Sequence, residues 1–245
     1  MAVQTIKTLG VIPARGGSKS IPRKNIVPVC GKPLIYYTIK SAAKAKLLDA
    51  CIVSTDDEEI ADIARSCGAD VPFLRPSGIS RDDSTDIEFL RHALLWLRDN
   101  RSWEPEIVLN LRPTSPLRTA GDIDAVIELM ETTGCDSVRT VIKPQHKPHK
   151  MWWLEDEARM RPLMPTEQFE TLGTDVPRQL LPQNIYWQTG LVDATRARFI
   201  LEENKIYGPD IRGLVSDPAR SIDLDDPDDL EMLDFIMRKR GYATV

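Results

Sequence analysis

The chain has 245 residues, 42% hydrophobic and 28% charged, which is enough for one sizeable core with at most a small additional subdomain. Its formal net charge of −5 argues against a nucleic-acid-binding protein, because such proteins are more often basic overall or along one face. No apolar run approaches twenty residues and the N-terminus lacks an apolar signal core, so we expect no membrane span and a cytoplasmic protein.

Short apolar runs alternate with helix-forming stretches along most of the chain. The apolar runs are typical of strands that are covered on both faces, since such strands show no polar alternation. The expected strands cover residues 9–12, 51–55, 71–74, 107–111, 137–142, 185–192 and 211–215. The expected helices cover residues 34–48, 60–67, 86–98, 121–131, 194–203 and 227–239. This order predicts an α/β fold, Rossmann-like, with a mostly parallel sheet and helices on both faces.

Residues 143–183 interrupt the alternation. This stretch is rich in Pro, Met and charged residues and contains the adjacent Trp152 and Trp153. We interpret it as a small subdomain inserted into a single domain. The paired tryptophans favour either a contact surface or internal packing, and composition leaves both interpretations open.

The first expected strand runs into a glycine-bearing cationic loop. Residues 9–25 read LGVIPARGGSKSIPRKN, so that Arg15, Lys19, Arg23 and Lys24 follow one another with no acidic residue among them. Backbone N–H groups and fixed positive charges in such a loop suit a polyphosphate, whereas the simpler alternative is a solvated basic loop. Neither GxxxxGK[ST] nor GxGxxG occurs here, which argues against a P-loop NTPase and a dinucleotide-binding dehydrogenase.

Polar side chains follow the next strands at equivalent places. Arg15, Asp56, Arg75 and Arg112 each come directly after one of the first four expected strands. Ligands of open α/β sheets bind at the carboxyl ends of the strands. We therefore expect these four side chains to surround one binding site.

Residues 13–25, PARGGSKSIPRKN, closely resemble the opening motif of the acylneuraminate cytidylyltransferases, the CMP-sialic acid synthetases and their bacterial relatives. Further segments similar to that family occur in the family's order, so the resemblance spans nearly the whole chain. They are VSTD at 53–56, LRP at 74–76, RPTSPLR at 112–118, PRQLLP at 177–182 and SIDLD at 221–225.

The resemblance implies a single nucleotidyltransferase domain over residues 1–245. Its implied reaction is attack of an α-keto sugar acid of the sialic or legionaminic type on the α-phosphate of CTP, which yields a CMP-sugar and pyrophosphate. It also implies a homodimer in which residues 143–183 form a dimerisation and acceptor-binding subdomain. The expected partners are thus CTP, a sugar acid and a second copy of the chain, with no nucleic acid and no membrane.

Six residues of this chain fall at positions that the family uses to bind the nucleotide. The positions that the resemblance assigns to CTP are Arg15, Ser18, Lys24, Asn25, Arg75 and Ser84. Cations around a triphosphate suit this chemistry, because nucleotidyl transfer depends mainly on positioning and on neutralising spread charge. We therefore expect Arg15 and Lys24 to be catalytic residues as well.

The acidic run near the C-terminus contains the expected metal ligands. At strand spacing, Asp223 and Asp225 face the same side, and two carboxylates there suit a hard cation such as Mg²⁺ or Mn²⁺. The family uses these two positions for its divalent ion, so we expect both to be catalytic. Asp226, Asp228 and Asp229 are better explained as the solvated acidic start of a helix.

The acceptor side departs from the family in two places. Lys150 and Arg178 align with cations that hold the acceptor's carboxylate region or neutralise the triphosphate. Arg112 stands where relatives carry Gln, and Gln188-Thr-Gly190 stands where relatives have Asn-Gly. A bidentate arginine is a natural partner of a carboxylate, so we expect Arg112 and Gln188 to contact the acceptor. The alternative is that a neighbouring acid holds Arg112, which then only braces its loop.

Two other functions remain compatible with the sequence. The first is a related nucleotidyltransferase whose acceptor is an eight-carbon Kdo-type acid or a sugar phosphate. The second is a non-catalytic nucleotide-binding module on the same fold, since fold alone does not separate these classes. The Asp223 and Asp225 pair argues against the second.

Overall fold

A computed structural model of the chain describes residues 6–164, 177, 179–222, 224 and 226–242. The chain divides into two units. The first, Met1–Val141 with Thr189–Val245, contains the sheet, and the second is Ile142–Gln188. No helix among the described residues has both the length and the apolar character needed to cross a bilayer.

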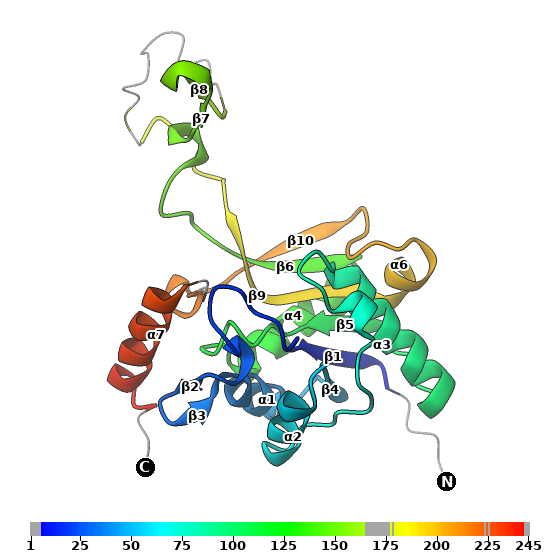
Figure 1. Cartoon of the computed structure of the whole chain (residues 1–245). Coiled ribbons are helices and arrows are strands. Elements are labelled where there is room, and N and C mark those ends of the chain that lie inside the picture. The colour runs from blue at the N-terminus through cyan, green and yellow to red at the C-terminus, as the bar shows by residue number, and fades with distance from the viewer. Residues whose placement is uncertain (1–5, 165–176, 178, 223, 225, 243–245) are drawn as a thin grey trace. The chain divides into compact units, whose positions relative to one another are not determined.

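The first unit is built on a six-stranded sheet in the order β10-β6-β9-β5-β1-β4 (Figure 1). The strands are β1 (Thr8–Pro13), β4 (Ala50–Ser54), β5 (Ile107–Asn110), β6 (Ser137–Ile142), β9 (Trp187–Arg196) and β10 (Ile211–Val215). β1 pairs in parallel with β4 and β5, and β10 pairs in parallel with β6. β9 pairs antiparallel with β5, so the sheet is mostly parallel, as predicted.

Helices cover both faces of this sheet because successive strand residues, which point to opposite faces, are apolar. On β1, Leu9 and Val11 pack into one core cluster with α3 and α6, whereas Ile12 packs into the other with α1, α2 and α4. On β5, Val108 belongs to the first cluster and Leu109 to the second. The helices are α1 (Leu34–Lys44), α2 (Glu58–Ser66), α3 (Asp86–Arg101), α4 (Ala120–Thr133) and α6 (Ala197–Glu202).

A third cluster packs α7 (Pro227–Lys239) against the region around β2 (Pro28–Val29) and β3 (Lys32–Pro33). Leu233 and Met237 of α7 are fully buried there beside Leu34 and Tyr37 of α1. This packing links the acidic segment before α7 to the region that follows the cationic loop.

Two expected elements differ from the structure. The expected strand over residues 71–74 makes one isolated bridge, Leu74 with Thr55, and the preceding Asp70 makes another with Ile52. Pro72 lacks the N–H that a strand ladder needs there. The expected helix over residues 194–203 begins late, because β9 continues through the β-branched Thr195 to Arg196 in register with β5.

The second unit contains the antiparallel pair β7 (Trp152–Leu154) and β8 (Met160–Pro162). Trp153 is 51% exposed, and Leu154 and Met160 are also exposed. Trp153 is therefore not packed internally within its unit, and that interpretation is wrong for this side chain.

Candidate active site

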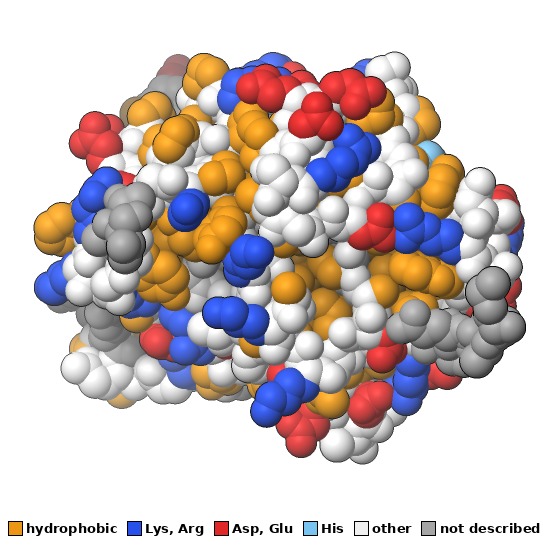
Figure 2. All heavy atoms as spheres, turned by 90° about the horizontal axis from the view of Figure 1, so that it is seen from below, with side chains coloured by type: hydrophobic (Ala, Val, Ile, Leu, Met, Phe, Trp, Pro, Cys, Tyr) orange, Lys and Arg blue, Asp and Glu red, His pale blue; other side chains and the backbone are white. Residues whose placement is uncertain are grey.

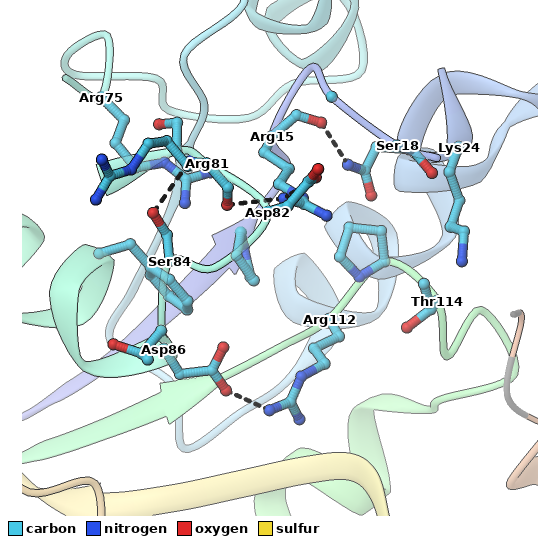
Figure 3. Close-up of a pocket in the computed structure, with 17 residues that line it drawn as sticks. Arg15, Ser18, Lys24, Arg75, Arg81, Asp82, Ser84, Asp86, Arg112 and Thr114 are labelled. Atoms are coloured by element: carbon cyan, nitrogen blue, oxygen red, sulfur yellow. Dashed lines mark hydrogen bonds and ion pairs between the residues drawn. The ribbon is translucent and has the colours of Figure 1, made fainter. Parts of the chain in front are cut away.

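A cavity of about 300 Å³ lies in the first unit beside the segments that follow β1 and β5 (Figure 3). Its walls come from the loop after β1, from Arg75, from residues 80–82 and 84–86 before and at the start of α3, and from the segment that begins at Arg112. Among the lining residues are several that the sequence analysis assigned to substrate binding: Arg15, Ser18, Lys24, Asn25, Arg75, Ser84 and Arg112. The structure thus gathers seven of them in one cavity.

Two carboxylates, Asp56 and Asp57, come just before α2 and contact the loop after β1. The Gly16 N–H donates to Asp56 Oδ1 at 3.0 Å, and a Cβ at Gly16 would lie 2.7 Å from Asp57 Oδ2. Only glycine allows this approach. Arg23 forms ion pairs with Asp57 and Glu59, which makes it a brace of the loop.

Four polar side chains of the loop line the cavity, Arg15, Ser18, Lys24 and Asn25, and three of them have hydrogen-bond or ion-pair partners as follows. Asn25 Nδ2 donates to the Arg15 carbonyl at 3.0 Å, which fixes the backbone beside the arginine. Lys24 Nζ donates to the Leu224 carbonyl at 2.6 Å and thereby connects the loop to the segment before α7. Arg15 Nη1 lies 2.9 Å from Asp82 Oδ1 and donates to the Arg81 carbonyl at 2.8 Å.

Arg75 also lines the cavity and contributes a buried positive charge to its wall. It is 6% exposed, its Nη2 donates to the Ser54 carbonyl at 3.0 Å, and its guanidinium lies 5.4 Å from the centre of the Phe89 ring. Burial lowers the pKa of Arg75, while Asp56 acts in the opposite direction. Among the described residues, the buried Arg75 Nε has no hydrogen-bond partner.

Arg112 forms a separate charged cluster. Its guanidinium pairs with Asp86 and donates to Asp193 Oδ2 at 2.9 Å, and Asn110 Nδ2 donates to Asp86 Oδ2 at 2.9 Å. Burial lowers the pKa of Arg112, but the two carboxylates outweigh burial and hold the pKa above its usual range. Figure 3 shows Arg112 with Asp86 apart from Arg15, Arg81 and Asp82.

The backbone and side chain of Arg112 are further held by neighbours. Arg118, 3% exposed, donates from Nη2 to the Arg112 carbonyl at 2.8 Å and from Nη1 to Thr38 Oγ1 at 3.1 Å, and its Nε donates to the Leu191 carbonyl. Gly190 has φ +65°, and a Cβ there would lie 2.9 Å from Arg112 Nη1. The glycine therefore both adopts the left-handed conformation and leaves room for the guanidinium.

A family model described as cytidylyltransferase matches residues 9–159. The chain is 32% identical over 241 residues to the CMP-N,N′-diacetyllegionaminic acid synthase of Legionella pneumophila, and the match covers 98% of this chain and 100% of that protein. This chain belongs to the cytidylyltransferase family. The sequence-based resemblance is thereby confirmed.

Other proteins similar to this cytidylyltransferase are also named as cytidylyltransferases. It is 29% identical over 243 residues to the N-acylneuraminate cytidylyltransferase of Escherichia coli, covering 98% of this chain and 54% of the relative. It is 45% identical over 89 residues to a pseudaminic acid cytidylyltransferase of Campylobacter jejuni, covering 36% of this chain and 38% of the relative.

Solved structures support the fold of the cytidylyltransferase. A CMP-2-keto-3-deoxy-manno-octonic acid synthetase complexed with CTP matches with TM-score 0.65 and 17% identity, covering 96% of this chain and 99% of that one. A 4-diphosphocytidyl-2C-methyl-D-erythritol synthase from Anaerococcus prevotii also matches with TM-score 0.65, at 14% identity, covering 96% of this chain and 98% of that one. At these identities the matches establish a common fold, and the predicted fold class is confirmed.

The remaining predicted residues of the cytidylyltransferase are not among those described at this cavity. Lys150 and Gln188 belong to the second unit, so their acceptor-binding roles stay predictions. Arg178, Asp223 and Asp225 lie outside the described residues. Within the described ranges no group of three or more His, Cys, Asp or Glu side chains could hold a metal ion.

Sequence reasoning missed the acids that line the cavity. Asp82 pairs with Arg15, and Asp86 pairs with Arg112. The signal was the acidic run RDDSTD over residues 81–86, which contains the capping residue Thr85 and ends at Asp86, the first residue of α3. Thr85 forms a capping box with Glu88, whereas Ser84 Oγ accepts a hydrogen bond from the Arg81 N–H at 3.0 Å.

Proposed function

We propose that this cytidylyltransferase transfers CMP from CTP to an α-keto sugar acid of the sialic or legionaminic type and releases pyrophosphate. The observation that carries the proposal is the cavity beside the ends of β1 and β5, which brings Arg15, Lys24 and Arg75 together. The names of the relatives support the choice of CTP and of a nonulosonic acid as substrates.

In this proposal the acceptor's anomeric hydroxyl oxygen forms a bond to the α-phosphorus of CTP. The bond from that phosphorus to the bridging oxygen breaks, and pyrophosphate leaves with the electron pair while the hydroxyl proton is lost. Negative charge spreads over the phosphate chain during the transfer. Arg15 and Lys24 would neutralise this charge, and Arg75 and Ser84 would position the nucleoside.

A divalent metal would complete the site. We propose that Asp223 and Asp225 hold Mg²⁺ or Mn²⁺, which when bound supplies further charge for the phosphate chain. The support from the described residues is Leu224, which lies between the two aspartates in sequence. Leu224 is buried, and its carbonyl oxygen accepts a hydrogen bond from Lys24 at the cavity wall.

The metal proposal is tested by pairing Asp225→Asn with the nearby control Asp228→Asn. Asp225→Asn should remove most turnover and Asp223→Asn should also be damaging, whereas Asp228→Asn should be nearly neutral. Binding of Mn²⁺ measured by electron paramagnetic resonance provides a second readout. Equal and small effects of all three substitutions would contradict the assignment.

On the acceptor side we propose that Arg112, Lys150, Arg178 and Gln188 contact the sugar acid. We further propose that the cytidylyltransferase is a cytoplasmic homodimer that uses residues 143–183 for assembly. The exposed Trp153, Leu154 and Met160 support an interface, because exposed apolar groups often mark contact surfaces. A mass near 27.6 kDa by light scattering at micromolar concentration would contradict the dimer.

Pyrophosphate release measured over a panel of acceptors and all four nucleoside triphosphates tests the activity itself. We expect release with CTP and a nonulosonic acid in the presence of Mg²⁺. Pyrophosphate release only with a Kdo-type acid, or only with another triphosphate and a sugar phosphate, would show that the proposed reaction is wrong. Binding of CTP without turnover on any acceptor would favour a non-catalytic module.

A further inference from the structure

The two loops that form the upper part of the cavity in Figure 3 are joined by one carboxylate. Asp82 Oδ1 lies 2.9 Å from Arg15 Nη1, and Asp82 Oδ2 lies 2.7 Å from Lys19 Nζ. Arg15 Nη1 also donates to the Arg81 carbonyl at 2.8 Å. The carboxylate therefore spans two cations of the loop that the sequence assigns to phosphate, and it does so from the facing segment.

The other loop cations are held differently. Arg23 pairs with Asp57 and Glu59 in and just before α2, where the pairing braces the loop from outside the cavity. Lys24 donates to a carbonyl oxygen, which carries no net charge. Asp82 is thus a full negative charge that lines the cavity and pairs with a cavity cation of this loop.

We propose that the Asp82 carboxylate competes with the phosphate chain for Arg15 and Lys19. This competition sets how tightly the cytidylyltransferase binds CTP and pyrophosphate. The proposal rests on the proposed function, in which Arg15 binds the triphosphate. Asp82 occupies Arg15 Nη1 and Lys19 Nζ, so a phosphate that binds these same donor groups displaces the carboxylate. When pyrophosphate leaves, the carboxylate pairs again with the same cations and lowers the free-energy cost of exposing them.

The contact is suited to exchange because it is exposed. Lys19 is 83% exposed and the Asp82 side chain is 44% exposed, so water can solvate each charge during the exchange. Exposed ion pairs are weak, and a polyphosphate carries several charges against the single charge of a carboxylate. The phosphate chain therefore displaces Asp82 from Arg15 and Lys19. The effect of Asp82 is to lower the affinity of the loop for the phosphate chain.

The test compares Asp82→Asn with Asp83→Asn in the full chain. Asp83 is the neighbouring acid; its side chain is 78% exposed and pairs with Arg81 at 3.4 Å but with no cation of the loop. Equilibrium dissociation constants for CTP and for inorganic pyrophosphate are measured by titration calorimetry without acceptor, at fixed Mg²⁺ and ionic strength. We expect Asp82→Asn to tighten both ligands by about two- to fivefold. Asp83→Asn should leave both constants unchanged.

The direction of the change separates competition from support. A carboxylate that merely holds the two loops together would, when removed, weaken both ligands or leave them unchanged, and either result would overturn the proposal. Asp82→Glu, which keeps the charge, should restore affinities close to those of the unaltered chain, and failure to restore them would also count against it. If the unaltered chain bound no CTP, the proposed function would be wrong; if it bound CTP and only the Asp82→Asn effect were missing, this inference alone would be wrong.

Discussion

The cavity has two cationic walls, and they are held in different ways. At the loop after β1, Arg15 and Lys19 are partly or largely exposed and share a single exposed acid, Asp82. At the other wall, Arg112 pairs with two acids, and the buried Arg118 holds its carbonyl oxygen. The difference indicates that the loop wall can exchange its partners with a ligand, whereas the Arg112 wall is part of the folded framework.

Arg118→Met should give the largest loss of stability. The substitution removes hydrogen bonds to the carbonyl oxygens of Arg112 and Leu191 and to Thr38 Oγ1, and leaves these buried acceptors without their donor. We expect a loss of about 3 kcal/mol in the free energy of unfolding, measured by urea denaturation. Arg15→Met at the loop wall is the control and should change stability by less than about 0.5 kcal/mol. Similar losses in both variants would remove the distinction between the walls.

Arg112→Gln should have an intermediate effect that also bears on the acceptor. Without the guanidinium, Asp86 and the largely buried Asp193 lose their ion pairs with Arg112, while Arg139 Nε stays 3.9 Å from Asp193 Oδ1, so we expect a loss of about 2 kcal/mol. If Arg112 contacts the sugar acid, the acceptor KM should rise or the acceptor preference should change while the CTP KM changes little. Steady-state kinetics with each substrate varied in turn decides this. A change confined to the CTP KM would place Arg112 on the nucleotide side of the cavity.

Alanine substitution of one glycine at each wall should give effects of opposite sign. Gly190→Ala forces a side chain into φ +65° and against Arg112, which should cost about 1–2 kcal/mol. At Gly17, a Cβ would meet no atom within 4 Å, so alanine there should be neutral or stabilising by up to about 1 kcal/mol. Denaturant midpoints measured side by side test the pair. Destabilisation by Gly17→Ala equal to that of Gly190→Ala would show that the loop is as tightly constrained as the other wall.

The smallest effect should come from the base of the loop and should depend on pH. A hydrogen bond from Arg23 lowers the pKa of Asp57 below its ordinary value, against the opposing effect of burial. Because the folded-state pKa is the lower one, this stabilisation is complete above the ordinary carboxyl pKa of about 3.9 and is lost as the pH falls through the folded-state value.

Asp57→Asn isolates this charge, since asparagine can still cap α2. The stability difference between the two chains should be below about 1 kcal/mol at neutral pH and should shrink on acidification towards about pH 3. Urea midpoints across that range measure it. A difference that stayed constant with pH would mean that the ion pair with Arg23 contributes nothing.

The sequence by itself determined the alternation of strands and helices, the cationic loop, and the family. These follow from local patterns: apolar runs such as residues 107–111, a capping residue such as Thr85, and an uninterrupted motif over residues 13–25. Local hydrogen bonding and side-chain periodicity fix such features within a few residues. The same reasoning placed Arg15, Arg75 and Arg112 at the carboxyl edge of the sheet, where the structure has them lining one cavity.

Only the tertiary structure decided which acid meets which cation. The sequence showed an acidic run before α3, but not that Asp82 would reach Arg15 and Lys19 while Asp86 would reach Arg112. It also did not show that β9 would continue to Arg196 alongside β5, where pairing with a neighbouring strand outweighs the helix propensity of Ala194. Such contacts join residues far apart in the chain, and their energies depend on distance and burial, which no local pattern encodes.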